Sequence, residues 1–248
     1  MLVQTDASQL EWRVLLELSR DSIGIPEVLA GADTHSLNQE AFELPSRLIA
    51  KKYLFRTIYR GSGWAFANDP EFSHVSADPK FWDGIGEQFY AKYAGIDRCH
   101  KVWANRVTSG KSLVGPFGRE WDVQMGRDRR GELKIPWTVL TNYPVQGTGA
   151  DVMKLARISF FRRLKALNIP EILLVSTVHD SICVDTPKEY CQVVAKLFYE
   201  VFDDLIANIK RCYGYEWVVP LGCEVKYGMN QMEMQKISQE DLVSGFKL

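Results

Sequence analysis

The stretch Arg47-Leu-Ile-Ala-Lys51-Lys-Tyr-Leu-Phe55-Arg-Thr-Ile-Tyr59-Arg-Gly61 carries the strongest pattern in this sequence. Arg47, Lys51, Phe55 and Tyr59 recur every four residues, so they share one broad face of a helix predicted over 46–60. Cations bind phosphate oxygens, and aromatic rings offer a flat surface on which a base can stack. This face therefore predicts a ligand with phosphates at one end and a base at the other. A solvated basic helix is the competing interpretation.

The composition is that of an ordinary globular protein. Of the 248 residues, 46% are hydrophobic and 25% are charged, and the formal net charge is −1, so binding to DNA would depend on locally clustered cations. No apolar run approaches the length of a membrane span, and the first residues do not resemble a secretory signal. The five cysteines form neither a Cys-x-x-Cys pair nor a zinc pattern, which predicts a reduced protein in the cytoplasm.

Helices and strands are predicted in a mixed order without regular strand–helix–strand alternation, which favours an α+β fold. Apolar runs predict strands over 2–5, 172–178, 182–184 and 218–225. Spacing of the apolar residues predicts helices over 9–20, 81–108, 144–168 and 187–211. Gly and Pro mark 21–45 as a link, 61–80 as a loop and 110–123 as a hairpin.

Two carboxylates end apolar strands. Asp6 follows the strand over 2–5, and Asp180 lies in the turn after 172–178. An aspartate at such a place often only turns the chain. Beside a helix suited to phosphates and a base, however, two aspartates on adjacent strand ends can hold two Mg²⁺ ions for an in-line phosphoryl displacement. Mg²⁺ suits this task because it takes few carboxylates and completes its octahedron with phosphate oxygens and water.

Five segments, taken in order, resemble motifs of the family A DNA polymerases, the bacterial DNA polymerase I type. They are Asp6-Ala-Ser-Gln-Leu-Glu11-Trp-Arg13, Arg47-x3-Lys51-x3-Phe55-x3-Tyr59, Asn142-x3-Gln146-Gly-Thr-Gly-Ala-Asp151, Val178-His-Asp180-Ser181 and Val219-Pro-Leu-Gly-Cys-Glu224-Val225. Order and spacing agree with the family from residue 1 to about residue 231. A single motif would be moderate evidence, whereas five in order are strong evidence of similarity.

The resemblance implies a polymerase palm, which is an antiparallel sheet with helices, and a mostly helical fingers subdomain inserted into it. Residues 1–20 and 135–231 would form the palm, 21–134 the fingers, and 232–248 a C-terminal tail. Four tryptophans are expected in the core of the fingers: Trp64, Trp82, Trp103 and Trp121.

The resemblance also implies which residues perform the chemistry. Asp6 and Asp180 would be the catalytic metal ligands for two Mg²⁺ ions, with the carbonyl of Ala7 as a further ligand. Lys51 would bind the triphosphate of the incoming nucleotide, and we hypothesise that it also donates a proton to the departing pyrophosphate.

The remaining implied roles concern the nucleotide and the DNA. Arg47 would hold the triphosphate with assistance from His35, Phe55 would stack on the sugar and base, and Tyr59 would close the pocket beside the templating base. Glu11 would fill the space of a ribose 2′-OH and so exclude ribonucleotides. Three residues would contact the primer end and the minor groove: Asn142, Gln146 and His179.

The implied activity is template-directed, DNA-dependent DNA synthesis, in which a primer 3′-OH attacks the α-phosphate of a dNTP and pyrophosphate leaves. The chain begins five residues before Asp6. We therefore expect a second polypeptide to supply the thumb and the rest of the palm, and it could also carry a 3′–5′ exonuclease. Split polymerases of this kind are familiar among bacteriophages, which favours a phage enzyme acting in the host cell.

Two other functions stay open at this point. A single-subunit RNA polymerase-like enzyme would share the aspartate pair and the Arg/Lys/Tyr helix, but Glu11 as a 2′-OH block argues against it. A non-catalytic primer-template binding module is the second, and the presence of both aspartates argues against it. A metal hydrolase built on His179-Asp180 would need further His ligands, and the chain has only four histidines.

The chain departs from the family pattern at several positions. Ala7 and Ser181 replace the usual Tyr and Glu; neither change removes a metal ligand, so we expect tuned activity. Arg56 and Arg60 stand where the family often has Gly, and they would either contact template or phosphate or be solvated. Thr138 replaces a frequent Arg, which removes one expected primer contact.

Overall fold

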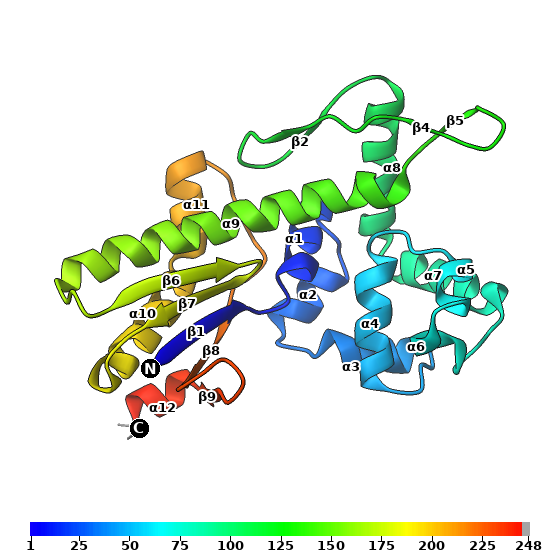
Figure 1. Cartoon of the computed structure of the whole chain (residues 1–248). Coiled ribbons are helices and arrows are strands. Elements are labelled where there is room, and N and C mark those ends of the chain that lie inside the picture. The colour runs from blue at the N-terminus through cyan, green and yellow to red at the C-terminus, as the bar shows by residue number, and fades with distance from the viewer. Residues whose placement is uncertain (245–248) are drawn as a thin grey trace. The chain divides into compact units, whose positions relative to one another are not determined.

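A five-stranded antiparallel sheet and a group of short helices organise two compact units of the chain (Figure 1). The computed structural model describes residues 1–244, so the last four residues of the predicted tail lie outside the described part. The sheet unit comprises Met1–Leu10 and the chain from Thr148 onward, and the helical unit comprises Glu11–Gly147. The mixed helices and antiparallel strands confirm the predicted α+β class.

The sheet has the order β6-β7-β1-β8-β9, with every neighbouring pair antiparallel. Its strands are β6 (Leu173–Val178), β7 (Ser181–Asp185), β1 (Leu2–Ala7), β8 (Cys223–Gly228) and β9 (Gln235–Ile237). The strand predicted over 218–225 therefore begins later than expected. Pro220 explains the delay, because proline has no backbone N–H to donate to a strand ladder.

The two faces of the sheet differ in burial. Along β1, Val3, Thr5 and Ala7 are buried, whereas the alternating residues, Asp6 among them, are partly exposed. The helix α10 (Cys191–Asp203) contacts β1 and β8. Phe198 of α10 stacks on Phe160 with ring centroids 4.2 Å apart, so α10 also packs against α9 (Trp137–Leu167), the helix that contains Phe160. Because side chains alternate along a strand, covering one face leaves Asp6 on the open face.

The predicted helix over 187–211 is wrong in its continuity. The chain forms a short 3₁₀ turn η1 (Lys188–Tyr190), then α10, then α11 (Leu205–Tyr213), which ends at Gly214 with φ of 65°. Asp203 and Asp204 lie at the break. Two negative charges at the carboxyl end of a helix oppose its dipole, which favours ending α10 there. A last helix, α12 (Gln239–Val243), follows β9 and opens with a Ser238–Asp241 capping box.

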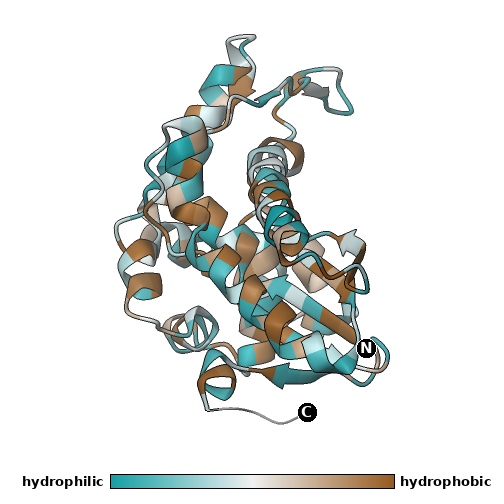
Figure 2. Cartoon of the chain, turned by 90° about the vertical axis from the view of Figure 1, so that its left-hand side faces the viewer, coloured by the Kyte–Doolittle hydropathy of each residue, from teal (hydrophilic) through white to brown (hydrophobic). Residues whose placement is uncertain are grey.

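The longest helix, α9 (Trp137–Leu167), begins seven residues before the predicted start at Pro144. Pro144 lies inside the helix, where it removes one hydrogen bond to the preceding turn. The true start follows Pro136, whose carbonyl accepts from Leu140 N at 2.9 Å. Polar and apolar segments alternate along the helices in Figure 2, and no helix within residues 1–244 is both long and apolar enough to cross a membrane.

The helical unit contains more helices than the sequence pattern predicted. They are α1 (Leu10–Ser19), α2 (Gly24–Leu29), α3 (Thr34–Ala41), α4 (Arg47–Thr57), α5 (Gly63–Ala67), α6 (Pro70–Ser73), α7 (Pro79–Lys92) and α8 (Ala94–Thr108). Two small hairpins follow, β2 (Leu113–Val114) with β3 (Glu120–Trp121), and β4 (Gly126–Arg127) with β5 (Leu133–Lys134).

The predicted link over 21–45 and loop over 61–80 are wrong because short capped helices occupy both segments. Ser62 and Asp69 accept hydrogen bonds from the first turns of α5 and α6, and Pro70 begins α6. Proline is tolerated in a first helical turn, where its missing N–H has no partner to lose. The Pro signals that indicated loop therefore mark helix starts.

The aromatic core of the helical unit forms around Trp82, which is 1% exposed. Its ring packs against Phe66 and Tyr53 at 5.4 and 5.8 Å between centroids. Trp103 and Trp121 pack against a second cluster that contains Leu113. These three tryptophans agree with the expected core positions, but Trp64 does not, because 68% of it is exposed on α5.

A buried carboxylate ties the start of α2 to the start of α8. Asp21 is 1% exposed and accepts hydrogen bonds from the backbone N–H groups of Ile23, Gly24 and Gly95 at 3.0, 2.8 and 2.7 Å. Side chains at Gly95 would collide with Asp21, since a Cβ there would lie 2.7 Å from its Oδ2. One carboxylate thus satisfies three amide donors that the interior would otherwise leave without partners.

We predict that Asp21→Ala lowers the free energy of unfolding by about 3 kcal/mol, because buried donors lose charged acceptors. Urea unfolding followed by tryptophan fluorescence measures the change. The matched control is Asp78→Ala, since Asp78 is an exposed cap that accepts from Lys80 N; that loss should cost about 1 kcal/mol. Equal losses in the two variants would contradict a special role for Asp21.

Candidate active site

Strand pairing brings the two predicted metal ligands to one end of the sheet unit. Asp6 on β1 is the register partner of Ser181 on β7, so it lies beside the residue that follows Asp180. Ala7 N donates to the carbonyl of Asp180 at 3.0 Å. His179 turns the chain between β6 and β7 with a positive φ of 53°. Both aspartates are half-buried, which leaves their carboxylates open to a ligand.

The Asp6 carboxylate is surrounded by donors that the sequence pattern did not reveal. Gln4 Nε2 lies 3.4 Å from each of its oxygens, and Lys226 Nζ lies 3.5 Å from Oδ2. Gln4 and Lys226 are register partners on β1 and β8, so both extend over the open face of the sheet. Only strand register joins these residues, which explains why sequence spacing could not identify them.

The residues at this end of the sheet fit Mg²⁺. Asp6 and Asp180 offer hard carboxylate oxygens from neighbouring backbone positions, which is the donor type Mg²⁺ prefers. Within residues 1–244, no group of three or more His, Cys, Asp or Glu side chains forms a closed metal cage. A pair of carboxylates suits an ion that takes its other ligands from phosphate and water better than it suits a structural zinc.

The helix α4 presents its cations because its opposite side is held by the core. Ser46 caps it by accepting from Ile49 N at 3.2 Å. The buried residues of α4 are Ile49, Ala50, Tyr53, Leu54 and Thr57. They form a stripe at helical spacing, so α4 is a packed amphipathic helix as well as a basic one.

Arg47 forms a two-point ion pair with Asp33, the cap residue of α3. Arg47 Nε lies 2.5 Å from Oδ2, and Nη2 lies 3.0 Å from Oδ1. The same carboxylate accepts from His35 N at 3.3 Å and from Ser36 Oγ at 2.6 Å. The Arg47 hydrogen bond holds the pKa of Asp33 well below its usual range. Asp33 is a residue that motif comparison missed, although Asp before a helix is a common cap.

His35 lies beside Arg47 in a buried position. It is 3% exposed, and its Nδ1 has no hydrogen-bond partner among the described residues. Burial lowers the pKa of His35, and the cations Arg47 and Lys51 lower it further, while Asp33 opposes them. His35 is therefore neutral at pH 7 and offers a hydrogen bond instead of a positive charge.

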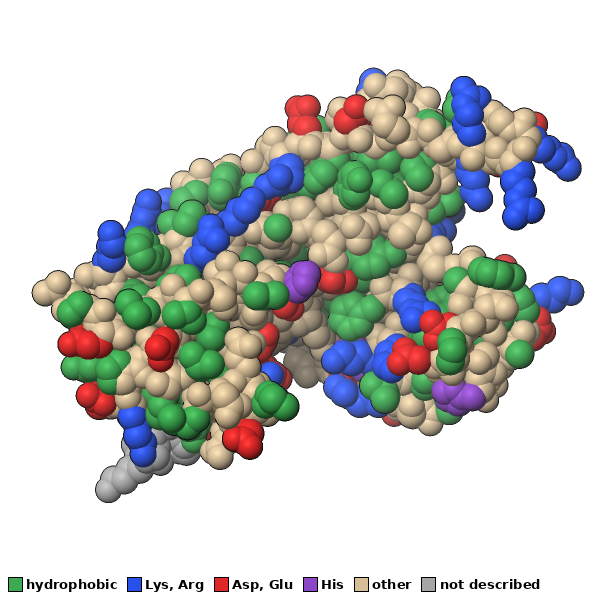
Figure 3. Space-filling view, in the orientation of Figure 1, with side chains coloured by type: hydrophobic (Ala, Val, Ile, Leu, Met, Phe, Trp, Pro, Cys, Tyr) green, Lys and Arg blue, Asp and Glu red, His purple; other side chains and the backbone are tan. Residues whose placement is uncertain are grey.

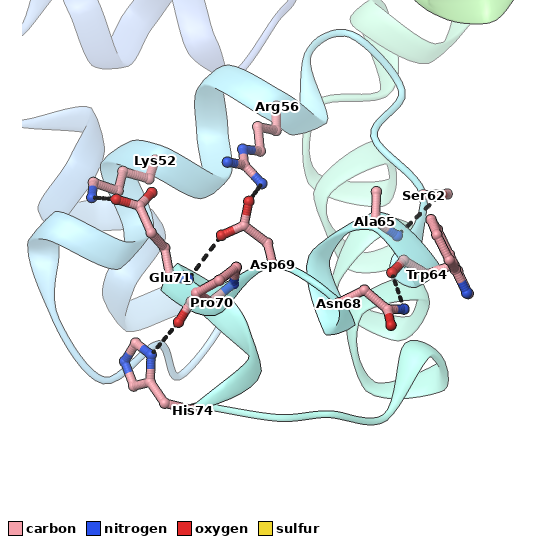
Figure 4. A network of polar contacts seen from close by, with 10 residues as sticks. All are labelled: Lys52, Arg56, Ser62, Trp64, Ala65, Asn68, Asp69, Pro70, Glu71 and His74. Atoms are coloured by element: carbon pink, nitrogen blue, oxygen red, sulfur yellow. Dashed lines mark hydrogen bonds and ion pairs between the residues drawn. The ribbon is translucent and has the colours of Figure 1, made fainter.

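Two further cations of α4, Lys52 and Arg56, are neutralised by an acid of α6 and by the acid that caps α6 (Figure 4). Lys52 pairs with Glu71, and Arg56 Nη1 lies 2.7 Å from Asp69. The Arg56 guanidinium also lies 4.8 Å from the centre of the Phe72 ring. Arg56 is therefore not simply solvated, and its contact with template or phosphate stays a prediction.

Arg60 is held by its own unit as well. Its Nη2 lies 2.6 Å from Asp97 and its Nε donates to Nδ1 of the buried His100 at 3.2 Å. The guanidinium lies over the rings of Tyr90 and Trp137 at 4.0 and 4.8 Å. Burial lowers the pKa of His100 to about 3, so His100 accepts as a neutral ring. Arg60 thus has a structural role and is not simply solvated, while its contact with template or phosphate stays a prediction.

Three predicted site residues meet in one hydrogen-bond network. Tyr59 Oη donates to Glu11 Oε2 at 2.6 Å, Gln146 Nε2 donates to Glu11 Oε1 at 2.5 Å, and Gln146 Nε2 lies 3.0 Å from Tyr59 Oη. Burial raises the pKa of Tyr59, and the hydrogen bond to the Glu11 carboxylate raises it further. Gly147 is needed beside this network, since a Cβ there would lie 2.4 Å from the ring of Trp121.

The other predicted residues are placed less tightly. The half-buried Phe55 ring lies 6.2 Å from the ring of His35. Lys51 is exposed, and no ion pair to it is present among residues 1–244. Asn142 is half-buried on α9, and His179 is exposed in its turn. Phe55, His35, Arg47 and Lys51 thus belong to one part of the helical unit, on α3 and α4.

Comparison with known proteins identifies the family. The chain matches DNA polymerase family A over residues 1–233 and belongs to that family. It is 28% identical over 241 residues to the thermostable DNA polymerase I of Thermus aquaticus, covering 92% of this chain and 26% of that protein. It is 24% identical over 262 residues to a DNA polymerase of Bacillus phage SP01, covering 99% of this chain and 28% of that protein.

A solved structure supports the predicted polymerase fold. The structure is similar to the POL domain of Pol1 from M. smegmatis in complex with DNA primer-template and dNTP, with a TM-score of 0.75 and 22% identity. The match covers 92% of this chain and 39% of that one. The fold predicted from the motifs, that of a family A polymerase domain, is therefore confirmed. The chain spans about a quarter of the length of the curated relatives described here.

We predict that Tyr59 makes stability sensitive to alkaline pH. Its pKa is raised in the folded chain, so its contribution is complete below about pH 10 and declines at higher pH, where the unfolded tyrosine ionises first. Tyr59→Phe should therefore lose less stability than the parent between about pH 8 and about pH 11. Urea unfolding across this range measures the difference. The exposed Tyr143 supplies the control, and a Tyr143→Phe profile matching that of Tyr59→Phe would refute the prediction.

Proposed function

We propose that this chain carries the catalytic palm and fingers of a template-directed DNA polymerase, which adds dNMP to a primer 3′-OH and releases pyrophosphate. The observation that carries the proposal is the pairing of β1 with β7, which brings Asp6 and Asp180 to adjacent positions on the open side of a sheet. Membership of DNA polymerase family A over 233 residues supports the same reaction.

The carboxylate pair would hold the metal. Two Mg²⁺ ions bound by Asp6, Asp180 and the Ala7 carbonyl would supply the positive charge that phosphoryl transfer requires. Gln4 and Lys226 lie within 3.5 Å of Asp6, so they keep its carboxylate oriented and partly compensated before a ligand arrives. His179, in the turn beside Asp180, would contact the primer end.

The proposed triphosphate site uses the free edge of Arg47. A guanidinium has five N–H donors in a rigid fork. Asp33 engages the Nε and Nη2 side of Arg47, which leaves the Nη1 and Nη2 edge for a phosphate. The exposed Lys51 would add a second charge and a proton donor to pyrophosphate, and the neutral His35 a hydrogen bond. Phe55 would stack on the sugar and base.

The proposed sugar site is the Glu11 network. Two hydrogen bonds, from Tyr59 and Gln146, fix the Glu11 carboxylate. A carboxylate held in this way cannot rotate aside for a ribose 2′-OH without breaking both bonds, which favours deoxyribonucleotides. Tyr59 would close the pocket beside the templating base, and Asn142 and Gln146 would contact the minor groove.

We further propose that a second polypeptide, which supplies the thumb and the rest of the palm, binds along the edge strand β6. Three apolar residues of β6 are more than half exposed, Leu173, Val175 and Val178 at 54%, 51% and 55%. An exposed apolar edge strand offers unpaired backbone groups and invites pairing. A thumb on the partner would add the grip on duplex DNA that a chain of net charge −1 needs.

The decisive experiment is primer extension with dNTPs and Mg²⁺, using this chain alone and with any co-purifying polypeptide. We expect extension that requires the metal and falls on the order of 10³-fold or more in Asp180→Ala. Extension only in the presence of the second polypeptide would support the docking proposal, and extension by the chain alone would contradict it. Preferred rNTP incorporation would favour an RNA polymerase, and DNA binding without any extension would favour a binding module.

We predict that Asp33→Asn raises the KM for dNTP about tenfold with a smaller change in kcat, because the guanidinium of Arg47 loses the charged partner that orients it. Steady-state extension at varied dNTP concentration measures both constants.

The matched control for this prediction is Asp69→Asn. Asp69 also caps a helix and also pairs with a cation of α4, but its cation is Arg56, which has a structural role. The control should leave the KM for dNTP within about twofold. A KM that falls in Asp33→Asn, or rises equally in both variants, would show that Asp33 does not position Arg47.

A further inference from the structure

A pocket with an apolar floor and a rim of polar side chains lies in the sheet unit between α9 and the β6–β7 turn. Lys154 and Arg157 line it from α9, while Thr177, His179 and Ser181 line it from the two strands and their turn. Lys154 and Arg157 are three residues apart, so they project from the same side of the helix. The motif comparison assigned a role to His179 alone, which leaves both cations of this pocket unexplained.

The residues that line the pocket include two cations, Lys154 and Arg157, and no Asp or Glu. Lys154 forms a long ion pair with Asp151 at 3.5 Å, and Arg157 Nη1 donates to the hydroxyl of Thr177 at 3.5 Å, so neither cation is held in a close ion pair among residues 1–244. Both cations are exposed. Figure 3 shows Lys and Arg side chains gathered along α9 in this view. Hydroxyl, imidazole, ammonium and guanidinium groups together form a donor set that suits a phosphate.

A second basic groove of the sheet unit differs from this pocket in how its cations are paired with acids. It lies between α9 and α11 and includes Arg162, Arg163 and Arg211. Arg163 pairs there with Glu200 and Asp204, and Arg211 Nη2 donates to Asn208 at 2.7 Å. Asp204 lines that groove and Glu200 borders it, so the charge of Arg163 is compensated there. The pocket at Lys154 and Arg157 is therefore the better phosphate site.

We propose that Lys154 and Arg157 bind a backbone phosphate of the primer strand, with Ser181 and Thr177 as additional donors. The inference rests on the proposed polymerase function, which brings the primer 3′ end to Asp180. His179 and Ser181 flank Asp180 in sequence and line the pocket. A primer strand whose 3′ end lies at Asp180 would therefore pass next to this pocket. Such a contact positions the primer without reading its sequence.

The test is the salt dependence of primer-template binding by the full chain, measured by fluorescence anisotropy. Arg157→Gln should weaken binding several-fold near physiological salt and reduce the slope of log K against log[salt] by about one, since one phosphate contact is lost. Lys154→Gln should act in the same direction. The matched control is Arg162→Gln, which removes the same charge from the same helix outside the pocket and should change the slope much less.

A second measurement identifies the phosphate. Single primer-strand phosphates are replaced by neutral methylphosphonates, one position at a time. The parent chain should lose affinity at one position near the 3′ end, and Arg157→Gln should be insensitive at that position. Equal sensitivity of parent and variant at every position would overturn the proposal, as would equal salt slopes for Arg157→Gln and Arg162→Gln.

The nucleotide triphosphate is the other source of a phosphate, and kinetics separate the two. Arg157→Gln should leave the KM for dNTP within about twofold while primer affinity falls. A raised KM with unchanged DNA binding would overturn the primer assignment. Primer extension by the parent with normal binding in Arg157→Gln would refute this site and leave the polymerase proposal intact, whereas no DNA binding and no extension by the parent would refute both.

Discussion

The pairing of β1 with the β6–β7 hairpin is the constraint on which the candidate active site depends. It brings Asp6 next to Asp180 and directs Asp6 to the face of the sheet that α10 does not cover. Because side chains alternate along a strand, a register slip of one residue would turn Asp6 toward the buried face and Thr5 toward the ligand. The buried Val3, Thr5 and Ala7 therefore fix the chemistry indirectly, by making that slip costly.

Ion pairing decides which cations of α4 remain available. Counted along the sequence, five cations between residues 47 and 60 suggest one large phosphate-binding surface. In the folded unit, Lys52, Arg56 and Arg60 are paired with acids and stabilise the packing around them. Arg47 is paired as well, but through one edge of its guanidinium, and Lys51 remains exposed. The helix thus separates cations that hold the fold from cations that can meet a ligand.

The hydrogen-bond network of Glu11, Tyr59 and Gln146 also serves both the fold and the proposed site. Its three members come from α1, the turn after α4, and α9, and each satisfies polar groups of the others. A polar network that is satisfied in this way resists rearrangement in surroundings where an unpaired group would be costly. The same arrangement that stabilises the helical unit can therefore present a fixed carboxylate to a sugar. Fold and proposed specificity depend on the same hydrogen bonds.

The sequence by itself determined the α+β class, the family and the basic helix, because these follow from motifs and periodicity within short segments. It misjudged the short helices at 24–41 and 63–73 and the start of α9, because cap residues and prolines also occur in loops, and the backbone N–H groups that the caps bind are not visible in the sequence. Only the tertiary structure decided that Trp64 is exposed, that Asp33 holds Arg47, that Lys226 lies near Asp6, and that Arg157 lines a pocket with His179 and Ser181. The physical reason is that register, burial and ion pairing join residues far apart in the chain, and no local pattern contains that information.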